Sequence, residues 1–265
     1  MSNINPKKPI VLVISGHDPS GGAGIQADIE SIASVGCHSV SVITSLTAQN
    51  TKEISEIIPQ NPDSFQKQIQ LILEDMAIDA CKIGMVGDTG LIDVICTELS
   101  DKNIPIVLDP IIRSGSGYIL ANEDVYRKIT EMLVPMSTLI TPNSIEARIL
   151  TKTDDLNIAA EKLLSFGCKY VLITGTHEET KLVINTLYSI NEPPIKFESE
   201  RLPNDYHGSG CTLSSSIAAY LALGIELNQA VENSLRFTWN CLNNAMQVGS
   251  GEKIPDRIRW RIKNN

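Results

Sequence analysis

Residues 10–36 read IVLVISGHDPSGGAGIQADIESIASVG, which is an apolar run, then a loop with four glycines, then an amphipathic stretch. A short apolar run bounded by turn residues is typical of a buried strand. The stretch from Gly24 onward places its apolar residues at helical spacing and is predicted to be a helix. A strand that leads through a loop into a helix favours an α/β fold with a mostly parallel sheet.

The same alternation continues along the chain. Further strands are predicted at residues 38–47, 78–84, 104–109, 138–141, 169–174 and 182–189. Further helices are predicted at residues 62–76, 89–102, 122–134 and 156–167, with one more from Gly208 and another from about Glu226 to Val248. Residues 191–203 look exposed. Seven strands suffice for a doubly wound sheet, and neither a linker nor an internal repeat interrupts them, so residues 1–265 are predicted to form a single domain.

The composition is that of a soluble globular protein, with 42% hydrophobic and 20% charged residues. A formal net charge of −9 argues against nucleic-acid binding, which requires a basic face. No apolar run approaches the roughly 20 residues that cross a membrane, and the first is too short for a signal peptide, so a cytoplasmic location is expected. The six cysteines contain no C-x-x-C pair, which argues against a zinc site and structural disulfides.

Ligands of α/β sheets bind beyond the carboxyl ends of the strands, so the loops that follow predicted strands are the candidate sites. The loop at residues 15–24, SGHDPSGGAG, lets the backbone approach a ligand closely, although it matches neither a P-loop nor a dinucleotide fingerprint. A flexible turn is the alternative. In TAQN, residues 47–50, the amide of Gln49 offers a donor and an acceptor to the edge of a heterocycle, unless it is merely solvated.

Two acidic residues follow later strands. Asp109, in VLDPIIRSGSG at residues 107–117, is suited to holding Mg²⁺ or shaping a phosphate site, and a turn cap is the alternative. In TPNSIEA, residues 141–147, Asn143 and Glu146 would share one helix face that points into the same crevice. Their spacing also fits a capping box, so it does not distinguish a site from a helix start.

The segment YHGSGCTLSSSIAAYLALG, residues 206–224, places a glycine-rich turn before a helix of small residues. Backbone N–H groups of Gly208, Ser209 and Gly210 can turn inward at the positive end of the helix, which favours binding of phosphate oxygens. We therefore predict an anion hole. Cys211 lies in the same field, so its thiol pKa is predicted to be lowered; an inert buried cysteine is the alternative.

Seven segments of the chain, taken together, resemble the hydroxymethylpyrimidine/phosphomethylpyrimidine kinases of thiamine biosynthesis, in the ribokinase superfamily. They are SGHDPSGGAGIQADIE, LTAQN, KIGMVGD, VLDPI, LITPNSIEA, TGTH and YHGSGCTLSSSIAAYLALG, in the family's order. The resemblance implies a three-layer α/β/α ribokinase-like sandwich with ATP and Mg²⁺ as cofactors. It also implies two phosphoryl transfers, to the 5-hydroxymethyl group of the pyrimidine and then to its monophosphate.

The resemblance also implies roles for single residues. Gln49 matches the glutamine that hydrogen-bonds the aminopyrimidine, and Cys211 stands where relatives such as ribokinase place a catalytic aspartate. Other positions of the pyrimidine pocket are Gly16, Ala23, Asp28, Met85 and Ile111. Positions around metal and phosphates are Asp109 and Glu146 for the metal, and Asn143, Thr174 and His177 for the nucleotide.

One departure from the family pattern concerns the nucleotide. Many members carry Lys-Gly-Gly-His where this chain has TGTH at residues 174–177, so Thr174 lacks a lysine charge expected near the ATP phosphates. Arg113 or Lys181 is expected to compensate.

Three other functions remain open at this stage. A pyridoxal or pyridoxine kinase uses a related pocket, and a pyrimidine-binding sensor would have kept the pocket without turnover. A cysteine hydrolase would require His207 to pair with Cys211. The sequence leaves the oligomeric state open, with a homodimer among the alternatives.

Overall fold

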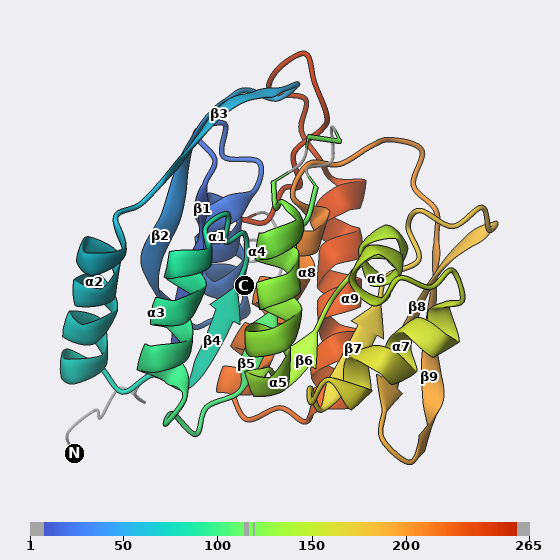
Figure 1. Cartoon of the computed structure of the whole chain (residues 1–265). Helices are drawn as coiled ribbons and strands as arrows, with labels where there is room; N and C mark the ends of the chain where they lie inside the picture. The colour runs from blue at the N-terminus through green and yellow to red at the C-terminus, as the bar shows by residue number, and fades with distance from the viewer. Residues whose placement is uncertain (1–7, 114–116, 119, 259–265) are drawn as a thin grey trace, which may run out of the picture.

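The computed structural model describes residues 8–113, 117–118 and 120–258, and its centre is a sheet of nine strands (Figure 1). The strand order is β3-β2-β1-β4-β5-β6-β7-β8-β9. Strands β1, β2 and β4 to β7 run parallel, whereas β3, β8 and β9 are antiparallel to their neighbours. The strand bounds are β1 Ile10–His17, β2 His38–Gln49, β3 Ile54–Pro59, β4 Ala80–Ile83, β5 Ile106–Leu108, β6 Leu139–Ile140, β7 Tyr170–Ile173, β8 Leu182–Ser189 and β9 Glu192–Glu200.

Helices cover both faces of this sheet. Strand β1 shows why, since its residues 11–14 are fully buried and alternate between two cores. Leu12 and Ile14 pack with the helices of one face, and Val11 and Val13 with those of the other. The first face carries α2 Pro62–Asp75, α3 Thr89–Leu99, α4 Glu123–Lys128, the π-helical turn Ile129–Leu133, α5 Val134–Met136, α6 Ser144–Thr151 and α7 Leu156–Ser165, and the second carries α1 Gly24–Val35, α8 Ser209–Ala222 and α9 Leu227–Asn243.

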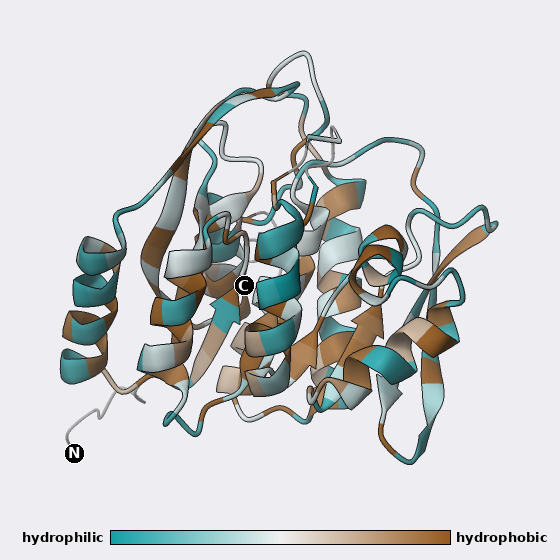
Figure 2. Ribbon diagram, in the orientation of Figure 1, coloured by the Kyte–Doolittle hydropathy of each residue, from teal (hydrophilic) through white to brown (hydrophobic). Residues whose placement is uncertain are grey.

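The predicted α/β fold with three layers and a mostly parallel sheet is confirmed. Figure 2 shows the apolar strands enclosed between helices whose outward faces are polar. All seven predicted strands are present, with β1 and β2 each two residues longer than predicted and β4 to β7 shorter. The last predicted helix ends at Asn243 rather than near Val248.

Two strands at the edges of the sheet were not predicted. Strand β9 carries Pro193 and Pro194, which argue against a central strand but are tolerated at an edge, where an N–H group can face solvent. The turn before it contains Asn191, whose positive φ of 65° suits a tight connection from β8. Residues 191–203 are therefore exposed, as expected, but most of them are a strand.

The order of the strands sets the position of the site. Strand β1 lies between β2 and β4. The connection after β1 leads toward one edge of the sheet, whereas the connections after β4 lead toward the other edge. Such a switch point opens a crevice beyond the carboxyl ends of the strands. None of the helices within the described ranges combines the length and the apolar character needed to cross a membrane.

Candidate active site

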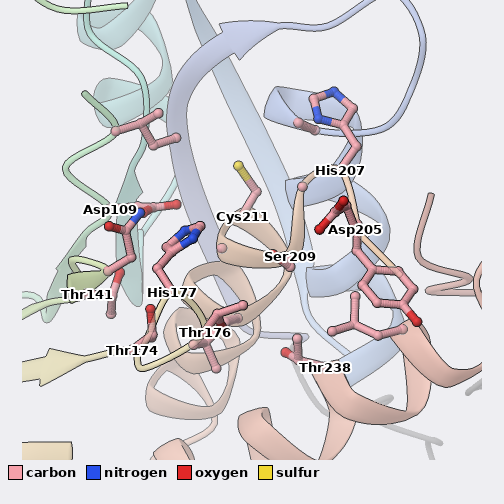
Figure 3. Close-up of a pocket in the computed structure, with 18 of the residues that line it drawn as sticks. Asp109, Thr141, Thr174, Thr176, His177, Asp205, His207, Ser209, Cys211 and Thr238 are labelled. Atoms are coloured by element: carbon pink, nitrogen blue, oxygen red, sulfur yellow. The ribbon is translucent and has the colours of Figure 1, made fainter. Parts of the chain in front are cut away.

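A cavity of about 1580 Å³ opens at the carboxyl ends of the parallel strands. Its wall includes the loops after β1, β4, β5, β6 and β7, the first turn of α8 and the end of β9. In the view of Figure 3, Cys211 lies between Asp109 on one side and His207 on the other. The predicted site residues that line the cavity are Gly16, Ala23, Gln49, Met85, Asp109, Ile111, Asn143, Glu146, Thr174, His177, Gly208, Ser209, Gly210 and Cys211.

The first turn of α8 has the geometry of an anion site. Gly208 caps the helix with a φ of 77°, a left-handed conformation that favours glycine. The N–H group of Thr212 donates to the Gly208 carbonyl, so the amides of residues 209–211 precede the bonds of the helix. A side chain at Gly208 would collide with the Gly22 carbonyl, which shows how closely the turn packs on the glycine-rich loop.

The glycine-rich loop is held in place by Asp18. One carboxylate oxygen accepts hydrogen bonds from the N–H and hydroxyl groups of Ser20, at 2.8 and 2.7 Å. The other accepts from the N–H of Ala23 and from Nε2 of His207, both at 2.8 Å. Burial disfavours the charge of Asp18, but the hydrogen bonds from His207 and Ser20 outweigh it and lower the pKa. The loop is therefore fixed, in contrast to the alternative of a flexible turn.

A second clamp comes from Arg257, whose side chain is fully buried. Its Nε donates to the Thr212 hydroxyl at 2.8 Å, and its Nη2 donates to the Gly22 carbonyl at 2.5 Å. Its Nη1 lies 3.2 Å from a carboxylate oxygen of Glu30 in α1. The guanidinium thus joins the glycine-rich loop, α1 and the first turn of α8.

The prediction that Asp28 forms part of the pocket wall is wrong. Its side chain points from α1 into the protein interior, where it is fully buried. It accepts hydrogen bonds from Lys82 of β4 at 2.8 and 3.0 Å and from Ser215 of α8 at 2.6 Å. The carboxylate is needed to balance the buried charge of Lys82, so it joins three elements beneath the cavity instead of lining it.

The predicted lowering of the Cys211 pKa is also wrong. Burial of the thiol raises its pKa to about 12, and the nearby charges of Asp28 and Asp109 add to that effect. The positive charge of Lys82 and the N–H of Gly24 act in the opposite direction but are weaker. The thiol is therefore protonated at neutral pH. Its neighbour Asp109 accepts a hydrogen bond from the hydroxyl of Ser214 at 3.2 Å.

Asp109 and Glu146 form a buried acidic pair. Burial raises the pKa of Asp109 to about 6, against the charge of Lys82. Burial and the neighbouring charge of Asp109 raise the pKa of Glu146 to about 8. Glu146 accepts from the N–H groups of Asn143 at 2.9 Å and Ile112 at 3.3 Å, and Asn143 caps α6 in return, so the capping box is present as well.

These two carboxylates fit a magnesium ion. The charge of Asp109 makes ionisation of Glu146 harder, and a divalent cation would relieve that repulsion. Within the described residues, no three histidine, cysteine or acidic side chains cluster as a closed metal site. Mg²⁺ commonly takes only one or two carboxylates and completes its shell with water and substrate phosphates.

Cations other than a lysine at position 174 line the cavity near the TGTH segment. Arg113 is one of them, whereas Lys181 is not among the lining residues, and compensation for the lysine charge stays a prediction. Arg201, just beyond β9, also lines it and donates to the carbonyls of Thr176 at 2.6 Å, Glu178 at 2.8 Å and Thr180 at 3.1 Å. Arg201 therefore holds the loop that contains the TGTH segment. It was not predicted, because β9 was not predicted.

Residues 18–256 match the family model for phosphomethylpyrimidine kinase. The chain belongs to the phosphomethylpyrimidine kinase family. The hydroxymethylpyrimidine/phosphomethylpyrimidine kinase of Aquifex aeolicus is 34% identical over 254 residues, which cover 93% of this chain and 99% of the relative. The resemblance noted in the sequence is thereby confirmed at the level of the family.

Two further proteins, one compared by sequence and one by structure, are similar to nearly the whole chain. A chloroplastic thiamine biosynthetic bifunctional enzyme of Arabidopsis thaliana is 34% identical over 259 residues, which are 94% of this chain, and the chain spans 50% of that relative's length. The structure of an ADP complex of Bacillus subtilis pyridoxal kinase superposes with a TM-score of 0.87 at 27% identity, covering 97% of this chain and 100% of that one. The fold is thus shared with a kinase of another heterocycle.

In this phosphomethylpyrimidine kinase family member, the residues that support the site were harder to predict than those that line it. Lys82 was the best signal, since it is a charged residue within an apolar predicted strand. His207 pairs with Asp18, and its other ring nitrogen lies 3.8 Å from Glu252. Among the described residues, the ring of His207 contacts Asp18, Gln49 and Glu252 rather than Cys211, so the structure does not support a cysteine hydrolase.

Proposed function

We propose that the protein transfers phosphoryl groups from ATP to 4-amino-5-hydroxymethyl-2-methylpyrimidine and then to its monophosphate, in thiamine biosynthesis. One observation carries this proposal: a single cavity joins an amide suited to an aminopyrimidine, an anion-binding turn and a buried carboxylate pair. The pyrimidine would contact Gln49 with Gly16, Ala23, Met85 and Ile111. The nucleotide would lie toward Asn143, Thr174 and His177.

The turn formed by residues 208–211 would stabilise the phosphoryl group during transfer. Phosphoryl transfer depends mainly on positioning and on electrostatic stabilisation of negative charge. A well-placed donor of this kind is typically worth about 3–4 kcal/mol of barrier. Its amides precede the helix bonds, and Arg257 and Gly22 hold the turn from behind, so the donors are in place before substrate arrives.

Asp109 and Glu146 would hold Mg²⁺. When bound, the ion neutralises charge on the nucleotide phosphates. The backbone N–H groups of Asn143 and Ile112 keep the Glu146 carboxylate oriented. Lys82 sits below Asp109 and supplies a fixed positive charge to this side of the site.

Cys211 would assist only the first transfer. The hydroxymethyl group must lose a proton, whereas the phosphate acceptor of the second transfer is already ionised. Because burial keeps the thiol protonated, it can take the alcohol proton only if its own proton moves to the neighbouring Asp109, on the carboxylate oxygen that does not hold Mg²⁺. That route uses groups that are all within the site.

Product analysis tests the function directly. Purified protein with the hydroxymethylpyrimidine, Mg²⁺ and ATP should yield the monophosphate and then the diphosphate. A folded protein that phosphorylates neither acceptor contradicts the kinase function and leaves the pyrimidine-binding sensor.

Pyridoxal is the second candidate acceptor, because of the likeness to the Bacillus subtilis pyridoxal kinase. Parallel assays with equal concentrations of both acceptors separate the two activities. A cytoplasmic location and a homodimer remain predictions, and sedimentation of the purified protein tests the second.

A further inference from the structure

The hydrogen bonds around Gln49 do not pair as the amide stands. Its Oε1 lies 2.9 Å from Oγ1 of Thr47, and its Nε2 lies 3.4 Å from Nε2 of His207. Thr47 Oγ1 is also 2.9 Å from the carbonyl of His17, and His207 Nε2 is 2.8 Å from Asp18. All of these groups lie at the pyrimidine end of the cavity.

Asp18 decides where the proton of His207 lies. Its carboxylate accepts four hydrogen bonds, which favour the ionised form, and an ionised carboxylate is an acceptor only. A contact of 2.8 Å to that carboxylate requires a proton on Nε2 of His207. Nε2 of His207 thus carries a single proton, which points mainly to Asp18 at 2.8 Å and is shared at most weakly with the end of the Gln49 amide that lies 3.4 Å away.

That proton determines the orientation of the Gln49 amide. With the amide nitrogen of Gln49 toward His207, an N–H group of the amide and the N–H group of the imidazole face each other. Turning the amide by half a turn removes both conflicts. Its nitrogen then donates to Thr47, whose own proton goes to the His17 carbonyl, and its oxygen faces the His207 N–H group that Asp18 also accepts. The two ends of an amide have nearly the same shape, so the surrounding donors decide the assignment.

We propose that Asp18 and His207 are positioning residues that fix the Gln49 amide with its oxygen toward His207 and so select a ring with an amino group at position 4. The proposal rests on the proposed function. The amide oxygen accepts from the amino group, and the amide nitrogen donates to ring nitrogen 3. A ring with a carbonyl at position 4 and a proton on nitrogen 3 presents an acceptor to the amide oxygen and a donor to the amide nitrogen. Neither pair can then form a hydrogen bond.

The same orientation places the reacting group. Along the ring, nitrogen 3, position 4 and position 5 follow one another. With nitrogen 3 toward Thr47 and the amino group toward His207, the 5-hydroxymethyl group lies on the side of the turn at residues 208–211, which follows His207 directly in the chain. One amide orientation thus selects the ring and aims it.

The test compares two acceptors in three variants. The ratio of kcat/KM for the 4-amino compound to that for its 4-oxo counterpart is measured in wild type, His207→Leu and His207→Gln. The ratio should fall about tenfold or more in His207→Leu, because the amide then keeps only one of its two anchors, and should recover in His207→Gln, which keeps a donor. Where the oxo compound is not turned over, calorimetric Kd values replace the rates.

Controls separate selection from a structural role. A structural role of His207 would lower both rates together and leave the ratio unchanged, which would overturn the proposal. Glu252→Gln, beside the other ring nitrogen, should leave the ratio unchanged.

Should His207→Leu fail to fold, Thr47→Val removes the opposite anchor of the amide and should lower the ratio in the same way. A wild-type protein without turnover of the 4-amino compound contradicts both this proposal and the proposed function, whereas turnover with an unaltered ratio contradicts this proposal alone.

Discussion

Cys211 is subject to two opposing effects. The amides at the start of α8 and the charge of Lys82 favour a thiolate, whereas removal from water favours the thiol. Burial is the larger effect because the sulfur is enclosed by α8 and the glycine-rich loop, and the negative charges of Asp28 and Asp109 strengthen it. The backbone of this turn therefore contributes more to the chemistry than the side chain does.

Cys211→Ala should slow phosphorylation of the hydroxymethylpyrimidine much more than phosphorylation of its monophosphate. The base is useful only for a neutral alcohol, while the amides of the turn serve both transfers. Steady-state rates with each acceptor measure the contrast. Equal rates near wild type would make Cys211 a packing residue, and equal abolition would give the thiol a different role.

Gly210 supplies the matching backbone control for this contrast. A Cβ at this position would lie 3.7 Å from Asp109, which alanine tolerates, whereas the branches of valine would crowd the phosphate path. Gly210→Val should therefore impair both transfers, while Gly210→Ala retains most of the activity.

Many residues that line the site could be predicted because they lie at or near the end of a predicted strand in a recognisable segment. Gln49 and Asp109 are of this kind. The Asp28–Lys82 pair could not, since its partners lie 54 residues apart and only the fold brings them together. The protonated thiol was missed for a related reason: the sequence shows the helix start at Cys211 but not the depth of burial.

At the scale of elements, the Asp28–Lys82 ion pair holds α1 and β4 together, and Ser215 adds α8. Lys82→Met should lower the free energy of unfolding by about 3–5 kcal/mol, because Asp28 then remains buried without a counter-charge. The double variant Asp28→Leu/Lys82→Met should recover most of that loss. Urea unfolding measures both, and a single variant as stable as wild type would show that the pair is dispensable.

Strand β9 brings Arg201 to the cavity wall beside the TGTH loop, where the nucleotide is proposed to lie. Arg201→Ala should raise the KM for ATP about tenfold, because the TGTH loop loses three charge-assisted hydrogen bonds and the cavity loses a cation. The KM for the pyrimidine should stay the same. Lys181→Ala, which removes a cation that is not among the cavity-lining residues, is the matched control. An unchanged KM for ATP in Arg201→Ala would contradict this role.

The parallel strands could be predicted because burial on both faces makes them continuous apolar runs, as in β1 and β4. Edge strands are exposed and carry no such pattern. In β9 the two prolines even suggest a loop, and the strand is recognisable only once β8 is present to pair with it.

For the molecule as a whole, the buried acidic pair makes stability depend on pH. The pKa of Glu146 is raised from 4.5 to about 8, so the folded protein binds a proton that the unfolded chain releases in this range. Without Mg²⁺, the free energy of unfolding should therefore fall as pH rises from about 4.5 to about 8. Thermal or urea unfolding with a chelator measures the trend.

Glu146→Gln supplies the control for this trend, because glutamine does not titrate. Its dependence on pH over the same range should be weaker than that of wild type. Adding Mg²⁺ should raise the stability of wild type most at the upper end of the range. A metal-free wild type whose stability rises with pH would contradict the raised pKa.

That residues 1–265 unfold as a single domain stays a prediction, which the same unfolding curves test through their cooperativity.

The clamp made by Arg257 has a consequence for how the protein is made. The guanidinium that ties Gly22 to the first turn of α8 is synthesised 235 residues after Gly22. All nine strands, which end at residue 200, can emerge from the ribosome and pair before this side chain exists. A nascent chain that stops short of residue 257 would thus have its sheet complete but its phosphate-binding turn untied. The turn at residues 208–211 is therefore tied to the glycine-rich loop only after every strand of the sheet has been synthesised.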